Sequence, residues 1–278
     1  MPSYVVTGVS QGLGAELLRQ LSSKPENLVI GLVRDKAGTE KKVASELPGR
    51  SNIHILRADI TSRDDLKKAA QETAAITGGS LDYLIANAAY VTSFDSFDPI
   101  DVLLFDSAET KPKEFAEDFH KLLDVNVLGN VYLYNAFVPL ILKGTTKKVV
   151  CITSGMADIE LVRNYDIGAG ALYAASKAAM NMVTAKYSAQ YKDQGVLFIG
   201  ICPGMVDVGK IKVEDLTPHQ IGAFQNLLGS FQRYEPNFKG PVTPDVAMKT
   251  VIKVWENASL EKGDGGGFLS HTGTDRWL

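Results

Sequence analysis

Cysteine and histidine are both scarce in this chain. Its 278 residues include two cysteines, Cys151 and Cys202, and four histidines. Two cysteines cannot build a disulfide framework, and both lie in apolar runs, so we expect buried strand residues. The histidines are widely separated in the sequence, without the spacing typical of a metal site. The sequence therefore predicts neither a disulfide-stabilised fold nor a metal centre.

Long apolar runs and a large net charge are also missing. No run approaches the ~20 apolar residues that a membrane span requires. The N-terminus, MPSYVVTG, has no basic segment followed by an apolar stretch. The formal net charge of −3 argues against nucleic acid or an anionic membrane as the main partner. We therefore expect a cytoplasmic protein with no nucleic-acid and no membrane partner.

Short apolar runs alternate with longer amphipathic stretches along the chain. Several runs are apolar at nearly every position, as strands buried on both faces must be. Gly129 and Pro139 suggest that the long fourth helix bends or stops early at its far end. The predicted strands are Tyr4–Thr7, Leu28–Val33, Ile53–Ala58, Leu81–Ala86, Lys148–Thr153, Val196–Cys202 and Gly267–Ser270, and the predicted helices are Leu13–Ser22, Lys36–Leu47, Arg63–Thr77, Lys113–Leu142 and Tyr173–Lys192.

Strands that alternate with helices are typical of a parallel sheet with helices on both faces. No linker rich in proline, glycine or serine divides the chain, so we expect a single α/β domain over residues 1–278, with about seven strands. Three segments break the alternation: Tyr90–Lys111, Met156–Leu172 and Met205–Pro241. Each follows an apolar run, so each is expected at the carboxyl end of a strand, where open α/β sheets bind ligands. We interpret them as walls of a substrate pocket, with residues 205–241 as its lid.

A glycine-rich turn joins the first predicted strand to the first predicted helix. Glycine permits a tight turn and a close approach of the backbone to a pyrophosphate. The N-terminus of the following helix offers free N–H groups to phosphates. The turn therefore predicts a dinucleotide site, and it reads Thr7-Gly8-Val9-Ser10-Gln11-Gly12-Leu13-Gly14.

Tyr173 and Lys177 stand four residues apart at the start of a predicted helix, so they share one helix face. A carbonyl that is reduced by hydride must gain a proton, and an ammonium group beside a tyrosine favours the phenolate left after proton transfer. Ser154 ends the fifth predicted strand, where its hydroxyl would hydrogen-bond to the carbonyl oxygen. The alternative interpretation of Ser154 is a turn serine. Alone, a tyrosine and a lysine four residues apart are a weak signal, because such pairs are common on exposed helices. After the glycine turn, Asn87-Ala88-Ala89 and a serine at a strand end, they suggest carbonyl chemistry.

Over nearly its whole length the chain resembles the short-chain dehydrogenase/reductase family, in the spacing TGxxxGxG, in Asn87-Ala88-Ala89, in Ser154 and in Tyr173-Ala174-Ala175-Ser176-Lys177. Within that family, the Arg34 pattern and the late strand Gly266-Gly267-Phe268-Leu269-Ser270 most resemble small cytosolic carbonyl reductases. The resemblance implies a Rossmann-type doubly wound fold with a bound dinucleotide. It also implies a catalytic set, Asn126, Ser154, Tyr173 and Lys177, in which Asn126 holds a water that links the lysine to solvent. The cofactor-binding residues that it implies are Gly8, Ser10, Gln11, Gly12, Leu13, Gly14, Arg34, Asp59, Ile60, Asn87, Ala88, Tyr173, Lys177, Pro203, Gly204 and Val206.

The end of the second predicted strand bears on the choice of dinucleotide. An NAD site places a carboxylate there for the ribose 2′-hydroxyl, whereas an NADP site needs a cation for the 2′-phosphate. In Val33-Arg34-Asp35, Val33 takes the family's acidic position and Arg34 follows it, which favours NADP(H). A shift of the alignment by two residues would restore an acid at Asp35 and favour NAD.

Four positions add detail to the resemblance. Asp59 matches the adenine-pocket aspartate of the family, although alone it would be interpreted as a helix N-cap, a role open to Thr61 and Ser62. Ala89 replaces a glycine of the family pattern, and Val208 stands where threonine is common. Ser154 lies 19 residues before Tyr173, a long gap caused by an insertion within Ala157–Leu172. This insertion leaves Thr153 as a substitute for Ser154.

These observations predict an NADP(H)-dependent oxidoreductase that reduces a ketone or aldehyde to an alcohol, with Tyr173 as the proton donor. Apolar and aromatic residues in the lid favour an apolar or aromatic substrate. Two alternatives stay open, an NAD-linked alcohol dehydrogenase and a sensor that binds NADP(H) without chemistry. The presence of both Tyr173 and Lys177 argues against the sensor. The resemblance also implies a homodimer or homotetramer, paired through the helices that contain Asn126 and Tyr173.

Overall fold

One parallel sheet forms the centre of the molecule. The computed structural model describes residues 1–104, 111–209 and 213–278, and within these ranges seven strands pair in the order β3-β2-β1-β4-β5-β6-β7. All neighbouring strands are parallel, which confirms the predicted doubly wound fold. The strands are β1 Ser3–Thr7, β2 Leu28–Val33, β3 Ile53–Arg57, β4 Tyr83–Ala86, β5 Lys148–Ile152, β6 Leu197–Cys202 and β7 Phe268–Ser270.

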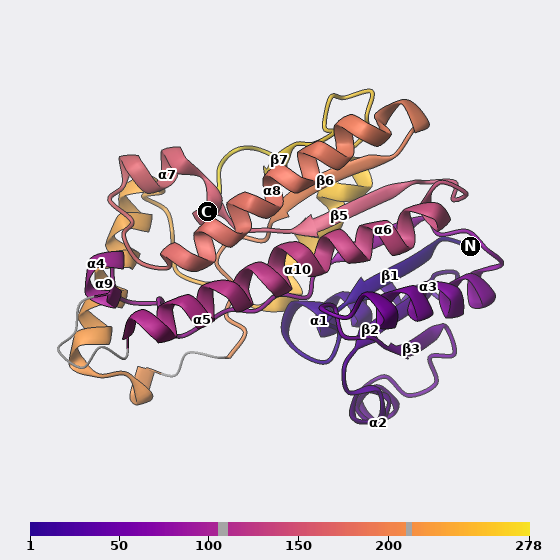
Figure 1. The fold of residues 1–278 in the computed structure, drawn as a ribbon, viewed down its shortest axis with the longest axis horizontal. Coiled ribbons are helices and arrows are strands. Elements are labelled where there is room, and N and C mark those ends of the chain that lie inside the picture. Colours follow the sequence, from indigo (N-terminus) through magenta and orange to yellow (C-terminus); the bar gives the residue numbers. More distant parts are fainter. Residues whose placement is uncertain (105–110, 210–212) are drawn as a thin grey trace.

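Helices cover both faces of the sheet (Figure 1). On one face pack α3 (Arg63–Thr77), α6 (Gly129–Ile141) and α8 (Ala171–Tyr191), and on the other α1 (Gly12–Leu21) and α10 (Pro244–Asn257). Each face buries its own apolar cluster, one around Phe137 and Phe198 and the other around Leu17 and Trp255. Helix α2 (Lys36–Glu46) lies beside the edge strand β3. Cys151 in β5 and Cys202 in β6 are free and buried, and their burial in strands is as expected.

The predicted helix Lys113–Leu142 is divided in the structure. Helix α5 (Lys111–Leu123) leads into a π-helical turn, η1 (Asp124–Leu128), and then into α6. The interruption therefore lies before Gly129, and the expected early stop near Pro139 is wrong, since Pro139 lies inside α6. Burial of the α6 side chains Phe137 and Ile141 against the sheet outweighs the cost of about 3 kcal/mol for an interior proline.

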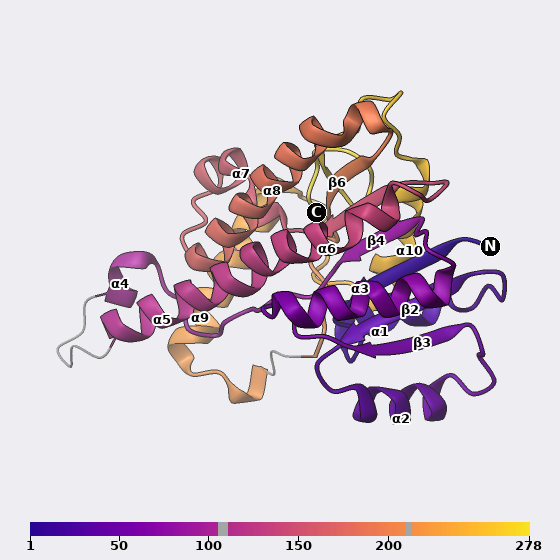
Figure 2. The ribbon, with the colours of Figure 1, turned by 45° about the vertical axis from the view of Figure 1, so that its right-hand side comes forward.

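Each of the three segments predicted to break the alternation contains one short or irregularly placed helix: α4 (Ile100–Leu104), α7 (Ile159–Asn164) or α9 (Pro218–Tyr234). Short 3₁₀ turns lie at η2 (Gly155–Ala157), at η4 (Val213–Asp215) and, after α8, at η3 (Lys192–Gln194). The helices α4, α7 and α9 lie at the end of the molecule away from the N-terminus, as both ribbon views show (Figures 1 and 2). Residues 105–110 of the first segment and 210–212 of the expected lid lie outside the described residues.

Among the described residues, no helix combines the length and the apolar character needed to cross a membrane.

Candidate functional site

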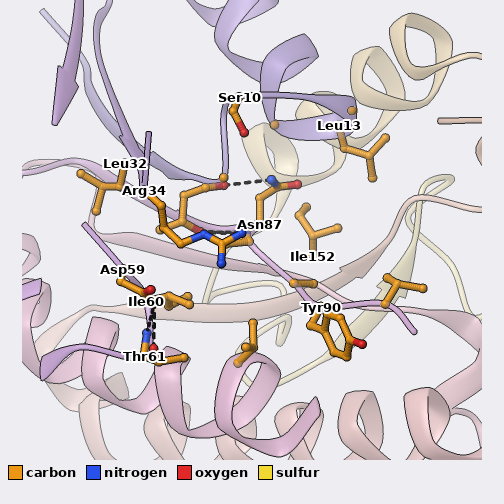
Figure 3. Close-up of a pocket in the computed structure, with 18 of the residues that line it drawn as sticks. Ser10, Leu13, Leu32, Arg34, Asp59, Ile60, Thr61, Asn87, Tyr90 and Ile152 are labelled. Atoms are coloured by element: carbon orange, nitrogen blue, oxygen red, sulfur yellow. Dashed lines mark hydrogen bonds between the residues drawn. The ribbon is translucent and has the colours of Figure 1, made fainter. Parts of the chain in front are cut away.

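A cavity of about 1190 Å³ opens at the carboxyl ends of the strands (Figure 3). Its walls come from the turns after β1, β2, β3, β4, β5 and β6. It lies where the strand order reverses, because the chain runs from β1 outward to β3 and then returns to β4 on the other side of β1. This switch point is where open α/β sheets bind dinucleotides.

The glycine turn forms the part of this wall between β1 and α1. Gly8 and Gly12 have φ values of +75° and +57°, a region that favours glycine. A Cβ atom on Gly14 would lie 2.1 Å from the carbonyl oxygen of Gly8. Gln11, the N-cap of α1, makes no side-chain capping bond, so the first N–H groups of the helix remain available to an anion. The cradle therefore fits a pyrophosphate.

Thr7 ties the ends of β1 and β4 together beneath this turn. Its Oγ1 accepts hydrogen bonds from Asn87 N at 3.0 Å and Ala88 N at 2.9 Å, and its carbonyl oxygen accepts one from Asn87 Nδ2 at 2.9 Å. These bonds fix the position of Asn87 at the cavity wall (Figure 3). The sequence alone did not reveal this role of Thr7, although the threonine opens the TGxxxGxG motif and is the available signal for it.

Arg34 and Asp35 follow β2 but have different surroundings. Arg34 lines the cavity, on the same side as Asp59 (Figure 3), and among the described residues no carboxylate forms an ion pair with it. Asp35 instead caps α2, where its Oδ1 accepts a hydrogen bond from Gly38 N at 2.9 Å, and it does not line the cavity. Val33 is buried. Arg34 is thus the charged residue of this strand end that faces the cavity.

Asp59 lies at the same side of the cavity, after β3. Its Oδ1 accepts hydrogen bonds from Thr61 N at 2.9 Å and Thr61 Oγ1 at 2.8 Å, while Ser62 caps α3. Burial disfavours the charged carboxylate, but the Thr61 bonds and the charges of Arg34 and Arg57 outweigh it, and the pKa of Asp59 lies below its ordinary value. Asp59 therefore presents an ionised acceptor to the cavity and is not the helix cap.

Tyr173 and Lys177 both line the cavity from α8. The Lys177 Nζ lies 5.7 Å from the centre of the Tyr173 ring and donates a hydrogen bond to Ile152 O at 2.9 Å. Lys177 is 5% exposed, so its ammonium acts at a site largely shielded from bulk solvent, where charge interactions are stronger. The two side chains thus meet as the helical spacing predicts.

Ser154 and Thr153 differ in their position relative to the cavity and in the hydrogen bonds of their hydroxyl groups. Thr153 lines the cavity, but it is buried and its hydroxyl donates to Asn181 Oδ1 at 2.7 Å. Ser154 is absent from the cavity lining; its Oγ accepts a hydrogen bond from Met156 N at 3.2 Å, which caps η2. Because the Ser154 hydroxyl is an acceptor there, its proton is available to another group. Within the described residues the two therefore differ: the Thr153 hydroxyl already has an acceptor, whereas the Ser154 hydroxyl only accepts.

Asn126 lies in the π turn η1 and does not line the cavity. Its Oδ1 accepts from Tyr90 N at 2.8 Å, and its Nδ2 donates to Tyr90 O at 3.0 Å and to Ser176 Oγ at 3.0 Å. The side chain therefore clamps the segment after β4 onto α8, a role that the sequence did not reveal. The predicted link through a water stays a prediction.

Most of the predicted cofactor residues line this one cavity. Gly204 and Val206 do not: Gly204 packs against the ring of His271, and Val206 forms a β-bridge with Val242. Val208 and Gly209 take part in the lining instead. The predicted cofactor residues that line the cavity are Gly8, Ser10, Gln11, Gly12, Leu13, Gly14, Arg34, Asp59, Ile60, Asn87, Ala88, Tyr173, Lys177 and Pro203.

Known proteins resemble this chain over most of its length. Residues 3–216 match the family model described as short chain dehydrogenase. The chain belongs to the short-chain dehydrogenase family. It is 53% identical to the short chain dehydrogenase virK of Hypocrea virens over 278 residues and 47% identical to the short-chain dehydrogenase/reductase iacC of Pestalotiopsis fici over 279, and each alignment covers both chains completely.

A solved structure extends the comparison to the fold. The NADPH-bound carbonyl reductase from chicken fatty liver superposes with a TM-score of 0.73 at 24% identity and covers 99% of this chain and 98% of its own. At this identity the likeness bears on the fold alone. Its membership of the short-chain dehydrogenase family makes the chain an oxidoreductase of a family that binds a nicotinamide cofactor.

The dehydrogenase has a second cavity, of about 480 Å³, formed by the three irregular segments. One wall comes from residues 97–99 and Val102, another from 166–169 and the third from α9. His219 Nε2, on α9, lies 2.6 Å from Asp98 Oδ1, which precedes α4. This contact joins two of the walls. The sequence predicted these segments as pocket walls but not a separate cavity.

The turns after β5 and β6 are held together in this dehydrogenase by buried groups. Cys202 Sγ accepts hydrogen bonds from Gly155 N at 3.0 Å and Gly204 N at 3.4 Å. The Trp277 side chain packs directly on Gly155, where a Cβ would lie 2.6 Å from the Trp277 Cβ, and its Nε1 donates to Asp158 Oδ2. The backbone beside Ser154 is therefore fixed from two sides.

Proposed function

We propose that this short-chain dehydrogenase reduces a ketone or aldehyde to an alcohol with NADPH, and that Tyr173 is the proton donor. The observation that carries this proposal is the pairing of Tyr173 with Lys177 on one face of α8, at the wall of the cavity that also contains the glycine turn and Arg34. Proton transfer and dinucleotide binding would then take place in one cleft.

NADP(H) fits the residues that surround the cavity. The glycine turn and the N-terminus of α1 would hold the pyrophosphate, and Asp59 would accept a hydrogen bond from the adenine ring. Arg34 would pair with the 2′-phosphate, to which its planar guanidinium is suited. The use of Asp35 as the cap of α2 supports the alignment that puts Arg34 in this role. When bound, NADPH supplies the hydride.

The residues of the chain itself would handle the proton and the carbonyl oxygen. Tyr173 Oη would donate a proton to the oxygen as the carbonyl is reduced, and the Lys177 ammonium would stabilise the phenolate that remains. The Ser154 hydroxyl would donate a hydrogen bond to the same oxygen and stabilise its developing charge. Asn126 would keep the segment after β4 in place through its bonds to Tyr90.

Side chains around the second cavity favour an apolar or aromatic substrate. Phe97, Ile167 and Leu227 are among its lining residues, and Leu227 belongs to an apolar cluster with Phe231 and Phe238. Polar side chains, among them Asp98, Asp166 and His219, line the cavity as well, and a combination of apolar walls with a few polar groups is typical of small-molecule sites. We infer that bulky apolar parts of the substrate lie toward this cavity while the carbonyl lies near Tyr173.

The test is the consumption of NADPH and of NADH with a panel of aromatic and aliphatic ketones and aldehydes. We expect turnover with NADPH, and loss of the general acid in Tyr173→Phe should slow it by about 10²- to 10⁴-fold. The matched control is Tyr187→Phe, on the same helix, which keeps its ring packing and loses one hydrogen bond to Asn135. Turnover only with NAD⁺ and alcohols would identify an NAD-linked alcohol dehydrogenase, and tight NADPH binding without any turnover would identify a sensor.

A further inference from the structure

Helix α8, which carries Tyr173, begins without a cap of its own. Its N-cap residue is Gly170, with φ of +71° and no side chain to accept a hydrogen bond. The first N–H groups of a helix have no partner within the helix. In α8 these groups belong to the turn Ala171–Tyr173, so the anchoring of this turn bears directly on where the tyrosine lies.

Asp95 supplies the missing cap from a distant part of the chain. Its Oδ2 accepts hydrogen bonds from Leu172 N at 2.7 Å and Tyr173 N at 3.1 Å, and its carbonyl oxygen accepts one from Gly170 N at 2.7 Å. The partners Asp95 and Leu172 are 77 residues apart in sequence. The carboxylate thus takes the place that the side chain of an N-cap residue would normally fill.

The Asp95 side chain is deeply buried, with 1% of the residue exposed. Burying a carboxylate is unfavourable unless it is hydrogen-bonded, and burial raises the pKa of Asp95 above its ordinary value despite the bonds from the two amides. A hydrophobic or neutral residue would fit such a position at a lower cost in solvation. The placement is therefore explained by the contact that it makes with α8.

The segment that carries Asp95 is anchored at its other end too. Asn126 holds the backbone of Tyr90, and Asp118 on α5 accepts hydrogen bonds from Tyr90 Oη, at 2.8 Å, and from Thr92 Oγ1. Residues 90–95 therefore form a strap between α5 and the first turn of α8. A shift at Asp95 would be resisted by α5, so the strap gives the first turn of α8 a fixed reference.

We propose that Asp95 is a positioning residue for Tyr173: it caps α8 in place of Gly170 and fixes the tyrosine at the cavity wall. This inference rests on the proposed function, because Tyr173 is taken as the proton donor. Asp95 itself does not line the cavity, so it acts through the helix backbone and does not touch the reacting atoms.

The test combines a structural readout with a kinetic one. Amide hydrogen exchange of Leu172 and Tyr173, together with kcat and the Kd for NADPH, would be measured for wild type, Asp95→Ala and Asp95→Asn. The control is Asp101→Ala, an exposed carboxylate on α4. In Asp95→Ala we expect about tenfold faster exchange at these two amides, the scale of losing one helix cap. We also expect kcat to fall about tenfold, the scale of misplacing a reacting group, while the Kd for NADPH stays within about twofold of wild type.

Asp95→Asn keeps an acceptor oxygen and should restore both readouts to near the wild-type values, and Asp101→Ala should change neither. If Asp95→Ala does not fold, Asp95→Glu replaces it, because the longer side chain displaces the acceptor while keeping the charge. Unchanged exchange in Asp95→Ala or Asp95→Glu would overturn the cap. Faster exchange with unchanged kcat, or a loss of kcat that Asp95→Asn does not restore, would overturn the positioning role.

The exchange readout does not need turnover. If the wild-type protein reduced no carbonyl with NADPH, the proposed function would fail, whereas the exchange rates at Leu172 and Tyr173 would still decide whether Asp95 caps the helix.

Discussion

The two halves of the main cavity are built in different ways. In the half around Arg34 and Asp59, the side chains lie just after their strands and bond to near neighbours, as Asp59 does to Thr61; the long-range bonds there are those of Thr7 to Asn87 and Ala88, which join two neighbouring strand ends. In the half around Tyr173, the contacts join distant segments: Tyr90 and Asn126 are 36 residues apart, Asp95 and Leu172 77, and Asp158 and Trp277 119.

The difference in contacts corresponds to two tasks, binding a dinucleotide and positioning a reacting side chain. Short turns after the strands present backbone N–H groups and one or two charges to a dinucleotide. A reacting group must instead be held to within a fraction of an ångström, and the first turn of α8, which carries Tyr173, is held by Asp95, whose own segment is bonded to α5 and η1. Substitutions should therefore act on binding in the first half and on turnover in the second.

The largest effect is expected for Gly14→Ala in the dinucleotide half. The new Cβ would lie 2.1 Å from Gly8 O and 2.5 Å from Asn87 Nδ2, so the turn must move. Overpacking of about 3 kcal/mol corresponds to a loss of NADPH affinity of about a hundredfold. Gly229→Ala on α9 is the control, since nothing lies within 4 Å of its Cβ. Binding titrations that give equal Kd values for the two variants would contradict the close-contact role of Gly14.

Arg34→Ala should separate the two cofactors. Loss of a charged hydrogen bond worth about 1.5–3 kcal/mol should weaken NADPH binding about 10- to 100-fold, and NADH binding should change little because NADH has no 2′-phosphate. Arg57→Ala is the matched control, because Arg57 already pairs with Asp65. Parallel Kd measurements for NADPH and NADH provide the check, and an equal loss for both cofactors would rule out recognition of the 2′-phosphate by Arg34.

Ala223→Trp tests the second cavity, which lies outside both halves of the main one. Ala223 lines the second cavity, so the larger ring should lower kcat/KM for bulky carbonyls by about tenfold, the scale of a steric penalty in an apolar pocket. Small aldehydes and NADPH binding should be unaffected. Gln225→Trp places the same ring at an exposed position of α9 that does not line this cavity. A uniform loss for substrates of all sizes would exclude a size-selective role of the cavity.

The smallest effect is a difference in pH dependence between Asp59 and Asp95. The pKa of Asp59 is lowered in the folded state, so its contribution to stability is present above its unfolded pKa of about 3.9 and is lost as the pH falls through the folded value. The pKa of Asp95 is raised by burial, so its contribution is present below that unfolded value and is lost as the pH rises through the folded one.

Urea unfolding of wild type, Asp59→Asn and Asp95→Asn between about pH 3 and pH 7 would reveal this difference. With rising pH, the free energy of unfolding of wild type should increase relative to that of Asp59→Asn and decrease relative to that of Asp95→Asn. Slopes of the same sign for the two pairs would show that the two carboxylates have similar surroundings.

The sequence was most informative where structure is local. The alternation of buried strands and amphipathic helices predicted the sheet, and Gly8–Gly14, Arg34, Tyr173 and Lys177 all lie at one cavity as expected. Each of these predictions needs only a few neighbouring residues, because strand period, glycine turns and helical i to i+4 spacing are local properties.

The features that the sequence did not reveal depend on contacts across the fold. A single Asp95 in a loop has no pattern of its own, and its partner amides become apparent only once β4 and α8 are adjacent. The π turn Asp124–Leu128 was missed because one extra residue in a turn hardly alters the apolar periodicity of a long helix. Pro139 was interpreted too strictly, since tertiary packing overrides a local helix breaker.

The strap from Tyr90 to Asp95 also has a consequence for the order of folding. Its far anchor is the first turn of α8, and that turn can be reached only after the intervening residues, including β5, have been brought to the sheet. Closing so long a loop is slow relative to forming local helices. We therefore expect a refolding chain to regain its helical signal first, its protected sheet next, and the wall beside Tyr173 last.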